Sequence, residues 1–251
     1  MDTERHEWKV RAIAIPAALV LAVGFHAWPL GHALQRTFLS MIVHELGHAV
    51  TAWWCGFSAL PGLWKTLIPE TRGLVWILVV ALELAIVGYG WRRARLAITL
   101  GGLALALLQF AGTRAPADDA QAWIIFGGDG GAMVLGTLLI ACFFIPRLAE
   151  HGLRWGLLVI GAAAFVDTSA TWWAARTDPD VIPFGEIEGV GQSDPSKLQE
   201  VYGWSTAQLV HRYVVLGMIC LGALAAVYAW SVYTARRQNA ASSETSPSTP
   251  T

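Results

Sequence analysis

The stretch "FLSMIVHELGHAVTAWWCGF", residues 38–57, is almost wholly apolar, yet it carries two histidines and a glutamate within five consecutive positions. Ionisable side chains placed inside a bilayer cost about 2.5–3.5 kcal/mol each even on insertion scales, so they are rare and usually functional there. A segment apolar enough to lie in a membrane therefore needs a compensating reason to hold three such groups. Ligation of a metal ion is one such reason.

The composition of the whole chain agrees with a membrane environment. Of its 251 residues, 55% are hydrophobic and only 14% are charged, whereas a soluble domain has about 25% charged residues. A helix crosses the bilayer core with about 20 apolar residues, and long apolar runs occur at residues 12–30, 36–57, 73–91, 95–112, 122–145, 154–175 and 207–233. These runs are too long for barrel strands of about ten residues. We predict an all-α polytopic membrane protein, a bundle of about six or seven transmembrane helices.

Charge and cysteine content argue against other classes of protein. The net charge of −1 gives no sign of a nucleic-acid partner. Cys55, Cys142 and Cys220 lie in or beside apolar runs without the spacing of a metal site, so we interpret them as small core residues. The first apolar run exceeds the 7–15 residues of a signal-peptide core, and we interpret it as a membrane span.

The composition along the chain predicts one membrane domain with short flanking segments. Residues 1–11 form an N-terminal segment, residues 12–233 a single transmembrane helical domain, and the Ser/Thr/Pro-rich residues 234–251 a disordered tail. Two connections are longer than the rest. Residues 57–72 are apolar enough to lie in the interface or re-enter the bilayer, and residues 176–206 form an acidic extramembrane loop.

The end of that loop contains helix signals. In "SDPSKLQEVYG", Asp194 is a plausible N-cap, Pro195 suits the first helical position and Gly203 a helix stop, so we expect a short helix. Ser205 and Gln208 have the spacing of a capping box at the start of the last span.

The motif "HELGH" at residues 44–48 predicts a zinc site. His44 and His48 are four residues apart, which on a helix places their rings about 40° apart and one turn along the axis. Both rings therefore reach one point, as a tetrahedral Zn²⁺ ion requires. Glu45, beside the first ligand, can act as a general base toward water.

A catalytic zinc site needs a third protein ligand besides the two histidines. Asp129 in "FGGDGGAM" is our first choice, because glycines beside a carboxylate allow close backbone approach. A Gly-rich turn with a capping aspartate is its plainer explanation. Glu83 and Asp167 are rival ligands in other apolar runs. His26 and His32 raise the possibility of a second histidine cluster, although each singly is typical of a membrane interface.

These motifs resemble those of the site-2-protease-type intramembrane zinc metalloproteases. "HELGHAVTAWWCG", "GGDGG" and "SDPSKLQEVYGWSTAQLVHRYVVLGM" are similar to segments of the small, compact bacterial peptidase-like branch. The resemblance implies His44 and His48 as zinc ligands, Glu45 as the base and Asp129 as the third ligand. The chain departs from the family in one respect, since two apolar runs, 73–91 and 95–112, separate the two motifs where the family commonly has one. Re-entry of the intervening segment or one incomplete crossing could restore the geometry.

The expected function is therefore intramembrane zinc-dependent peptide hydrolysis, in a bacterial inner membrane, with a membrane-embedded peptide as substrate. Gly127, Gly128, Gly130 and Gly131 would line the substrate's access path. Two alternatives remain at this stage: a non-proteolytic membrane protein that keeps the metal for a structural or regulatory role, and a transporter with an acidic pathway through Glu83, Asp129 and Asp167. The sequence leaves substrate, orientation and oligomeric state open.

Overall fold

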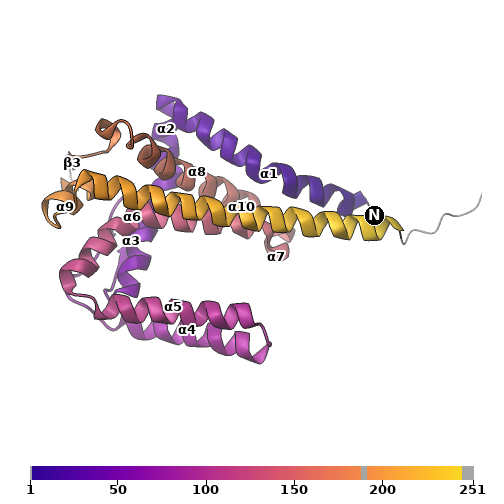
Figure 1. Cartoon of the computed structure of the whole chain (residues 1–251), viewed down its shortest axis with the longest axis horizontal. Coiled ribbons are helices and arrows are strands. Elements are labelled where there is room, and N and C mark those ends of the chain that lie inside the picture. The colour runs from indigo at the N-terminus through magenta and orange to yellow at the C-terminus, as the bar shows by residue number, and fades with distance from the viewer. Residues whose placement is uncertain (1, 188–190, 245–251) are drawn as a thin grey trace, which may run out of the picture. The chain divides into compact units, whose positions relative to one another are not determined.

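The chain is built almost entirely from helices (Figure 1). The computed structural model describes residues 2–187 and 191–244. Its α-helices are α1 (Asp2–Ala27), α2 (Pro29–Gln35), α3 (Met41–Trp54), α4 (Val75–Arg92), α5 (Leu96–Arg114), α6 (Ala117–Ala141), α7 (Pro146–Glu150), α8 (Leu153–Ala174), α9 (Asp194–Glu200) and α10 (Thr206–Glu244). A π-helical turn, η1 (Arg36–Ser40), precedes α3, and the 3₁₀ turns are η2 (Cys142–Phe144) and η3 (Pro179–Val181).

Sheet is confined to two antiparallel hairpins of two-residue strands among the described residues. Strands β1 (Leu60–Pro61) and β2 (Thr66–Leu67) pair Leu60 with Leu67, and strands β3 (Glu186–Ile187) and β4 (Gly191–Gln192) pair Glu186 with Gln192. The predicted all-α class is therefore confirmed.

Six helices within residues 2–187 and 191–244 are long and apolar enough to cross a membrane. They lie at Glu7–Ala27, Val75–Arg92, Leu96–Arg114, Ala117–Phe144, Leu153–Ala174 and Thr206–Asn239. The protein is thus a multi-pass membrane protein. The expected run at 36–57 is not among the six, because it is divided between η1 and the 14-residue α3.

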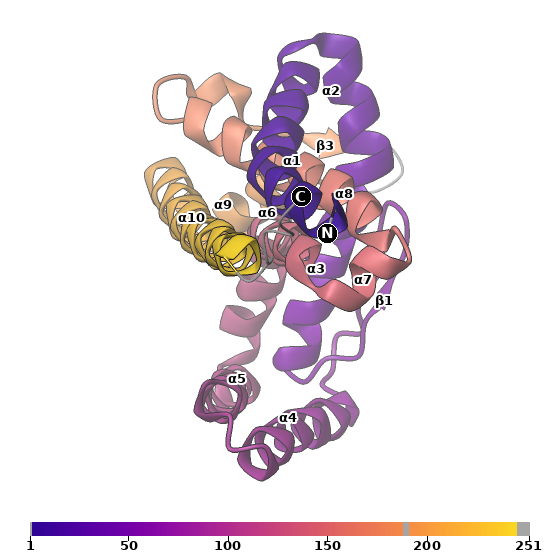
Figure 2. The same ribbon diagram turned by 90° about the vertical axis from the view of Figure 1, so that its right-hand side faces the viewer.

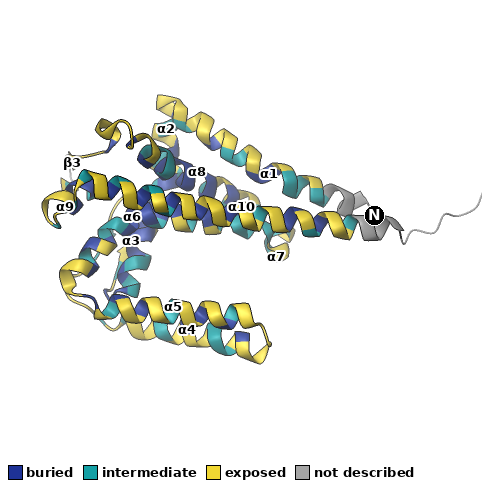
Figure 3. Cartoon of the chain, in the orientation of Figure 1, coloured by how far each residue is buried: buried dark blue, intermediate teal, exposed yellow. Residues whose placement is uncertain are grey.

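The long helices carry apolar side chains on their outer surfaces, as a lipid environment requires. In the hydrophobic windows of α4 and α5, only 11% and 22% of the residues are buried, and both helices are coloured largely as exposed in Figure 3. Leu82 and Leu107 are 62% and 70% exposed. Water would penalise such surfaces, whereas acyl chains solvate them.

Contacts group the chain into two compact units, where the sequence predicted a single domain over 12–233. Unit 1 comprises Met1–Ser40, Met133–Ala170 and Val214–Thr251, and unit 2 comprises Met41–Ala132 and Thr171–Tyr213. The continuous helices α6, α8 and α10 each contribute residues to both units.

In unit 2, α4 and α5 lie side by side in both views (Figures 1 and 2). Glycine permits this approach, since a Cβ on Gly102 would lie 2.8 Å from Val87 Cγ2. Residues 57–72 form the β1–β2 hairpin, and a bridge between Phe57 and Arg72 closes its base. The Arg72 guanidinium donates to the carbonyls of Cys55 (3.0 Å) and Ala115 (2.6 Å), which satisfies carbonyls beyond the ends of α3 and α5.

In unit 1, polar contacts join helices that are distant in sequence. Arg154 of α8 pairs with Glu7 of α1 at 2.7 Å, and Tyr228 of α10 donates to the carbonyl of Ala12 at 2.8 Å. Both contacts bind α1 to a later helix of the same unit.

In the acidic loop, the predicted short helix and capping box are present, but the N-cap residue differs from the predicted one. A short helix, α9, forms as predicted, but its N-cap is Ser193, whose side chain accepts from Ser196 N. Asp194 is instead the first helical residue, so its carboxylate is not occupied by capping. The capping box is confirmed, because Ser205 N donates to Gln208 Oε1 at 2.9 Å and Gln208 N donates to Ser205 Oγ at 3.2 Å.

The C-terminal segment contains more helix than the sequence suggested. Helix α10 continues to Glu244, through much of the 234–251 segment for which we expected disorder. Ala, Arg and Gln at residues 235–241 are good helix formers, which favours this continuation. Residues 245–251 lie outside the described residues.

Replacing Leu82 with Lys tests the membrane-facing surface. Leu82 lies in the middle of α4, so a charge there costs about 2.5–3.5 kcal/mol of insertion free energy. We expect the Leu82→Lys variant to give several-fold less protein in carbonate-washed membranes, with Leu82→Met as the matched control at wild-type level. Equal membrane yields for the two variants would contradict a lipid-facing α4.

Candidate metal centre

Helix α3 places the three predicted residues of the HELGH motif in the interior of unit 2. His44, Glu45 and His48 are 7%, 5% and 8% exposed. Each offers one ligand atom, and these atoms lie within 4.8 Å of one another. The His44 and His48 rings are 4.7 Å apart between centroids and nearly perpendicular. The i, i+4 geometry predicted from the sequence is therefore present.

Hydrogen-bond acceptors lie behind both rings, where they favour the tautomer that binds a metal. His48 Nδ1 lies 2.7 Å from the carbonyl oxygen of Ile124, and His44 Nδ1 lies 3.0 Å from Asp129 Oδ1. A carbonyl and a carboxylate only accept, so in the metal-binding form of the centre we assign the proton of each neutral ring to Nδ1. Both Nε2 atoms then present a lone pair on the opposite side.

The third member of the centre is Asp194, from the first turn of α9. Its Oδ2 lies 3.1 Å from His44 Nε2 and 2.9 Å from His48 Nε2, and the two Nε2 atoms are 3.1 Å apart. Three electron-rich atoms thus form a nearly equilateral triangle. A tetrahedral Zn²⁺ with bonds of about 2.0–2.1 Å spaces its ligands about 3.3–3.4 Å apart, so the triangle fits such an ion after a small expansion.

The environment of Asp194 favours its charged form. Burial by itself raises the pKa of this carboxyl group, but the charges and hydrogen bonds of His48 and His44, when those rings are protonated, outweigh burial and hold the pKa well below its usual range. A carboxylate ionised at neutral pH is what a divalent cation requires. The sequence analysis missed this residue because it assigned Asp194 to helix capping.

Asp129 lies on the other side of the His44 ring from this triangle. Its Oδ1 accepts from His44 Nδ1, and its Oδ2 accepts from Trp172 Nε1 at 2.8 Å. The side chain is 7% exposed. Such a carboxylate–histidine pair orients the ring and raises its basicity toward a metal. The geometry therefore favours Asp129 as an orienting partner of His44 and Asp194 as the third ligand, where the sequence favoured Asp129 itself.

Glu45 is held by the β1–β2 hairpin. Thr66 Oγ1 lies 2.7 Å from Glu45 Oε2 and 2.8 Å from the Glu45 carbonyl oxygen, and its single proton can be donated to either. No sequence signal identified Thr66, which lies 21 residues from Glu45.

The glycines of α6 allow it to pack closely against α3. A Cβ on Gly47 of α3 would lie 2.9 Å from Gly131 Cα, and one on Gly127 would lie 2.8 Å from Thr51 Cβ. A Cβ on Gly128 would come within 2.6 Å of His44 Cε1 and His48 Nε2. Gly127, Gly128 and Gly130 are buried. These glycines were expected to line an access path; in the structure α3 and the two rings cover Gly127, Gly128 and Gly131.

The rival acidic residues have other partners. Glu83 of α4 accepts a hydrogen bond from Trp54 Nε1 at 3.0 Å. Asp167 belongs to unit 1, where it contacts His32 and Arg36.

An aromatic stack encloses the Asp129 side of the centre. The rings of Trp172 and Tyr213 are stacked at 4.1 Å between centroids, and Tyr213 stacks in turn on Phe126 at 4.3 Å. Trp172 and Tyr213 are almost fully buried. Such a wall lowers the local dielectric and strengthens the charged contacts inside it.

Comparison with known proteins gives no further guidance on this centre. No protein-family model, no curated protein and no solved structure matches the chain. The chemical interpretation therefore depends on the residues of the centre and on the motif resemblance.

Two asparagine variants distinguish the roles of the two aspartates. Asp194→Asn removes a charged oxygen from the triangle, so we expect zinc affinity to fall by well over 100-fold. Asp129→Asn removes an orienting hydrogen bond, and such partners are worth about 10–100-fold in affinity. Chelator competition on the purified protein measures both. Loss of zinc in Asp129→Asn with retention in Asp194→Asn would reverse the assignment.

Gly128→Ala tests the contact between α6 and the rings. The added methyl group would overlap both imidazoles, so we expect reduced zinc occupancy in a protein that still folds. Gly88→Ala in α4 is the matched control, because a Cβ there meets nothing within 4 Å and alanine favours a helix. Unchanged zinc occupancy in Gly128→Ala would contradict the described ring positions.

Proposed function

We propose that the protein is an intramembrane zinc-dependent endopeptidase of the site-2-protease type. The observation that carries the proposal is the triangle of His44 Nε2, His48 Nε2 and Asp194 Oδ2, with edges of 2.9–3.1 Å, beside the buried carboxylate of Glu45. Two imidazoles and one carboxylate form a donor set found in catalytic zinc sites, which keep a further position open.

The donor set fits zinc because all three inward-facing atoms are lone-pair donors once the rings are protonated at Nδ1. Without a cation, two bare imidazole nitrogens and a carboxylate oxygen would repel one another at these distances unless protons were taken up. When bound, Zn²⁺ supplies a Lewis acid that polarises a carbonyl group and lowers the pKa of water toward 7.

Glu45 provides the proton transfers of hydrolysis in this proposal. Its carboxylate takes a proton from water as the water oxygen forms a bond to the scissile carbonyl carbon. The C–N bond then breaks, and Glu45 returns the proton to the leaving amine, so that one water is consumed for each peptide bond. A carboxylate oxygen of Glu45 lies within 4.8 Å of a ring nitrogen of each histidine, so it would reach a water held beside them.

Thr66 is a positioning residue in this scheme. Its hydroxyl binds Glu45 Oε2, so Glu45 Oε1 remains available for water and the carboxylate is fixed in one orientation.

The membrane environment limits the substrate class. A peptide helix hides its carbonyl groups in internal hydrogen bonds, so cleavage requires local unwinding. Membrane segments containing Gly or Pro unwind most readily, and we propose these as substrates. The motif resemblance supports placement in a bacterial inner membrane.

Glu45→Gln separates metal binding from catalysis. We expect the variant to retain wild-type zinc content, because Glu45 is outside the triangle, and to lose at least 100-fold in cleavage rate, because general acid–base catalysis contributes about 10²–10⁴-fold. The substrate is a labelled apolar peptide of about 20 residues with a central Gly-Pro pair in liposomes. Mass spectrometry in H₂¹⁸O detects the single ¹⁸O atom that hydrolysis adds to the new carboxylate.

Glu70→Gln is the matched control, since Glu70 is exposed on the hairpin segment; it should cleave as the wild type does. Cleavage that survives in Glu45→Gln would rule out the assigned base. A wild-type protein that binds zinc yet hydrolyses no such peptide would favour the non-proteolytic alternative. Ion flux that survives loss of His44 would favour the transporter.

A further inference from the structure

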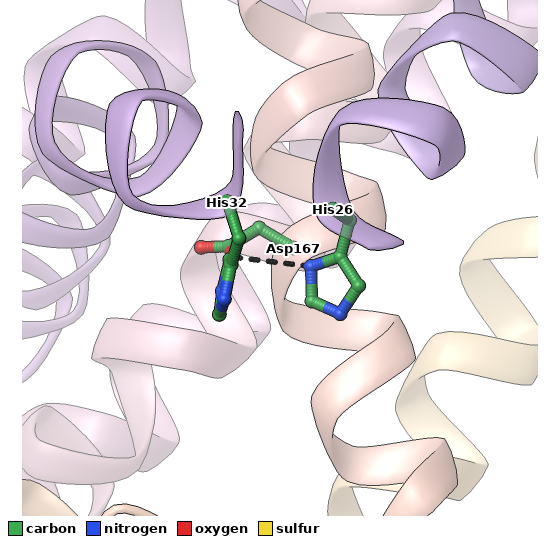
Figure 4. Close-up of side chains that lie close together, drawn as sticks. All are labelled: His26, His32 and Asp167. Carbon is green, nitrogen blue, oxygen red and sulfur yellow. Dashed lines mark hydrogen bonds and ion pairs between the residues drawn. The ribbon is translucent and has the colours of Figure 1, made fainter. Parts of the chain in front are cut away.

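A second group of two histidines and an aspartate lies in unit 1 (Figure 4). His26 is in the last turn of α1, His32 in the short α2, and Asp167 in α8. Asp167 Oδ1 lies 2.9 Å from His32 Nε2 and 3.6 Å from His26 Nδ1. The ring centroids are 4.4 Å apart. One nitrogen from each ring and one carboxylate oxygen lie within 4.8 Å of one another.

An ion pair explains only part of this arrangement. Arg36 Nη1 binds Asp167 Oδ2 at 3.0 Å, which compensates the charge of a carboxylate whose side chain is fully buried. The other oxygen, Oδ1, is the one that faces both rings. The contact of Arg36 Nη1 with Oδ2 does not account for the two imidazoles that converge on Oδ1.

The state of His26 supplies the second observation. Its Nδ1 atom is buried and has no hydrogen-bond partner among the described residues, although it points toward Asp167 in Figure 4. A buried nitrogen left without a partner destabilises the fold. A ligand placed between the two rings and Asp167 Oδ1 would satisfy this nitrogen.

We propose that His26, His32 and Asp167 form a second binding site for a divalent transition metal, separate from the HELGH centre. Two imidazole nitrogens and one carboxylate oxygen suit Zn²⁺ and neighbouring first-row ions. Arg36 then acts on the outer oxygen of the carboxylate and fixes its orientation, as partners of metal ligands commonly do.

The site is accessible to ions. The candidate span Glu7–Ala27 has 21 residues, about 31 Å of helix, which matches a bilayer core of about 30 Å. His26 therefore lies near one end of the span, where water reaches the headgroups. The side chain of His32 is 40% exposed and that of Asp167 is fully buried, so the site is open on the His32 side and its ion can exchange.

The metal would also stabilise the break between α1 and α2. Helix α1 ends at Ala27 and α2 begins at Pro29, with extended backbone at Trp28 between them. His26 and His32 lie on either side of this break, and Asp167 lies on α8. One ion would therefore tie both sides of the break to α8, beside the contact from Gln35 Nε2 to the Ala163 carbonyl at 3.2 Å.

The test measures zinc stoichiometry in full-length protein purified in detergent with a histidine-free affinity tag. Metal is stripped with chelator, restored with buffered Zn²⁺, and counted by elemental analysis. We expect two zinc ions in the wild type, one after His44→Ala with His48→Ala, and one after His26→Ala with His32→Ala. All four substitutions together should leave none. Because the first double variant lacks the HELGH ligands, its remaining zinc is independent of the proposed function.

The matched control is His151→Ala with His211→Ala, since both residues are exposed and both lie outside the two groups. It should keep two zinc ions, and an unchanged elution volume and helical circular dichroism confirm folding of every variant. A protein that loses only the HELGH ligands and then binds no zinc would overturn the proposal.

A second measurement works without altering the proposed site. In the protein lacking His44 and His48, diethyl pyrocarbonate modifies accessible imidazoles, and mass spectrometry identifies each modified residue. We expect Zn²⁺ to suppress modification of His26 and His32 several-fold while leaving His151 and His211 unchanged. Equal modification of His26 and His32 with and without Zn²⁺ would contradict metal binding there.

Discussion

The arrangement of unit 2 depends on one close contact. The Nε2 atoms of His44 and His48 and the Oδ2 atom of Asp194 lie within 3.1 Å of one another. The surroundings are buried and largely apolar, so three such atoms at this distance require either shared protons or a cation between them. The bonds behind the rings, to the Ile124 carbonyl and to Asp129, keep the lone pairs aimed at that point. A metal ion bound at this point would therefore stabilise the fold around it.

The membrane setting explains how such a centre is assembled. Helices satisfy their own backbone groups, so they can lie in lipid, whereas irregular segments are tolerated at that depth only when protein surrounds them. Here α3 supplies the histidines, but Thr66 comes from a hairpin and Asp194 from a short helix in a loop. The close approach of α3 and α6, permitted by Gly47 and Gly131, brings Asp129 to the back of the His44 ring.

The two histidine–aspartate groups have similar donors and different neighbours. At the HELGH centre, the carboxylate of Glu45 lies beside the donors and Thr66 holds it in place. At the second group, the neighbouring charged side chain is Arg36, which binds the aspartate itself. A carboxylate neighbour can accept a proton, whereas a guanidinium cannot. This difference is why we propose hydrolysis at the first centre and ion binding alone at the second.

The sequence by itself determined the features that depend on local spacing. Apolar run lengths gave the helical membrane class, four-residue spacing gave the paired rings of His44 and His48, and Ser205 with Gln208 gave the capping box. Only the tertiary structure decided the partners. Asp194 lies 150 residues from His44, and its availability depends on a one-residue shift of the N-cap to Ser193. Likewise Asp167, predicted as a rival ligand, pairs with His32 at a separation of 135 residues. Periodicity fixes which face of one helix a side chain occupies, but the pairing of distant segments is set by packing, which no local pattern records.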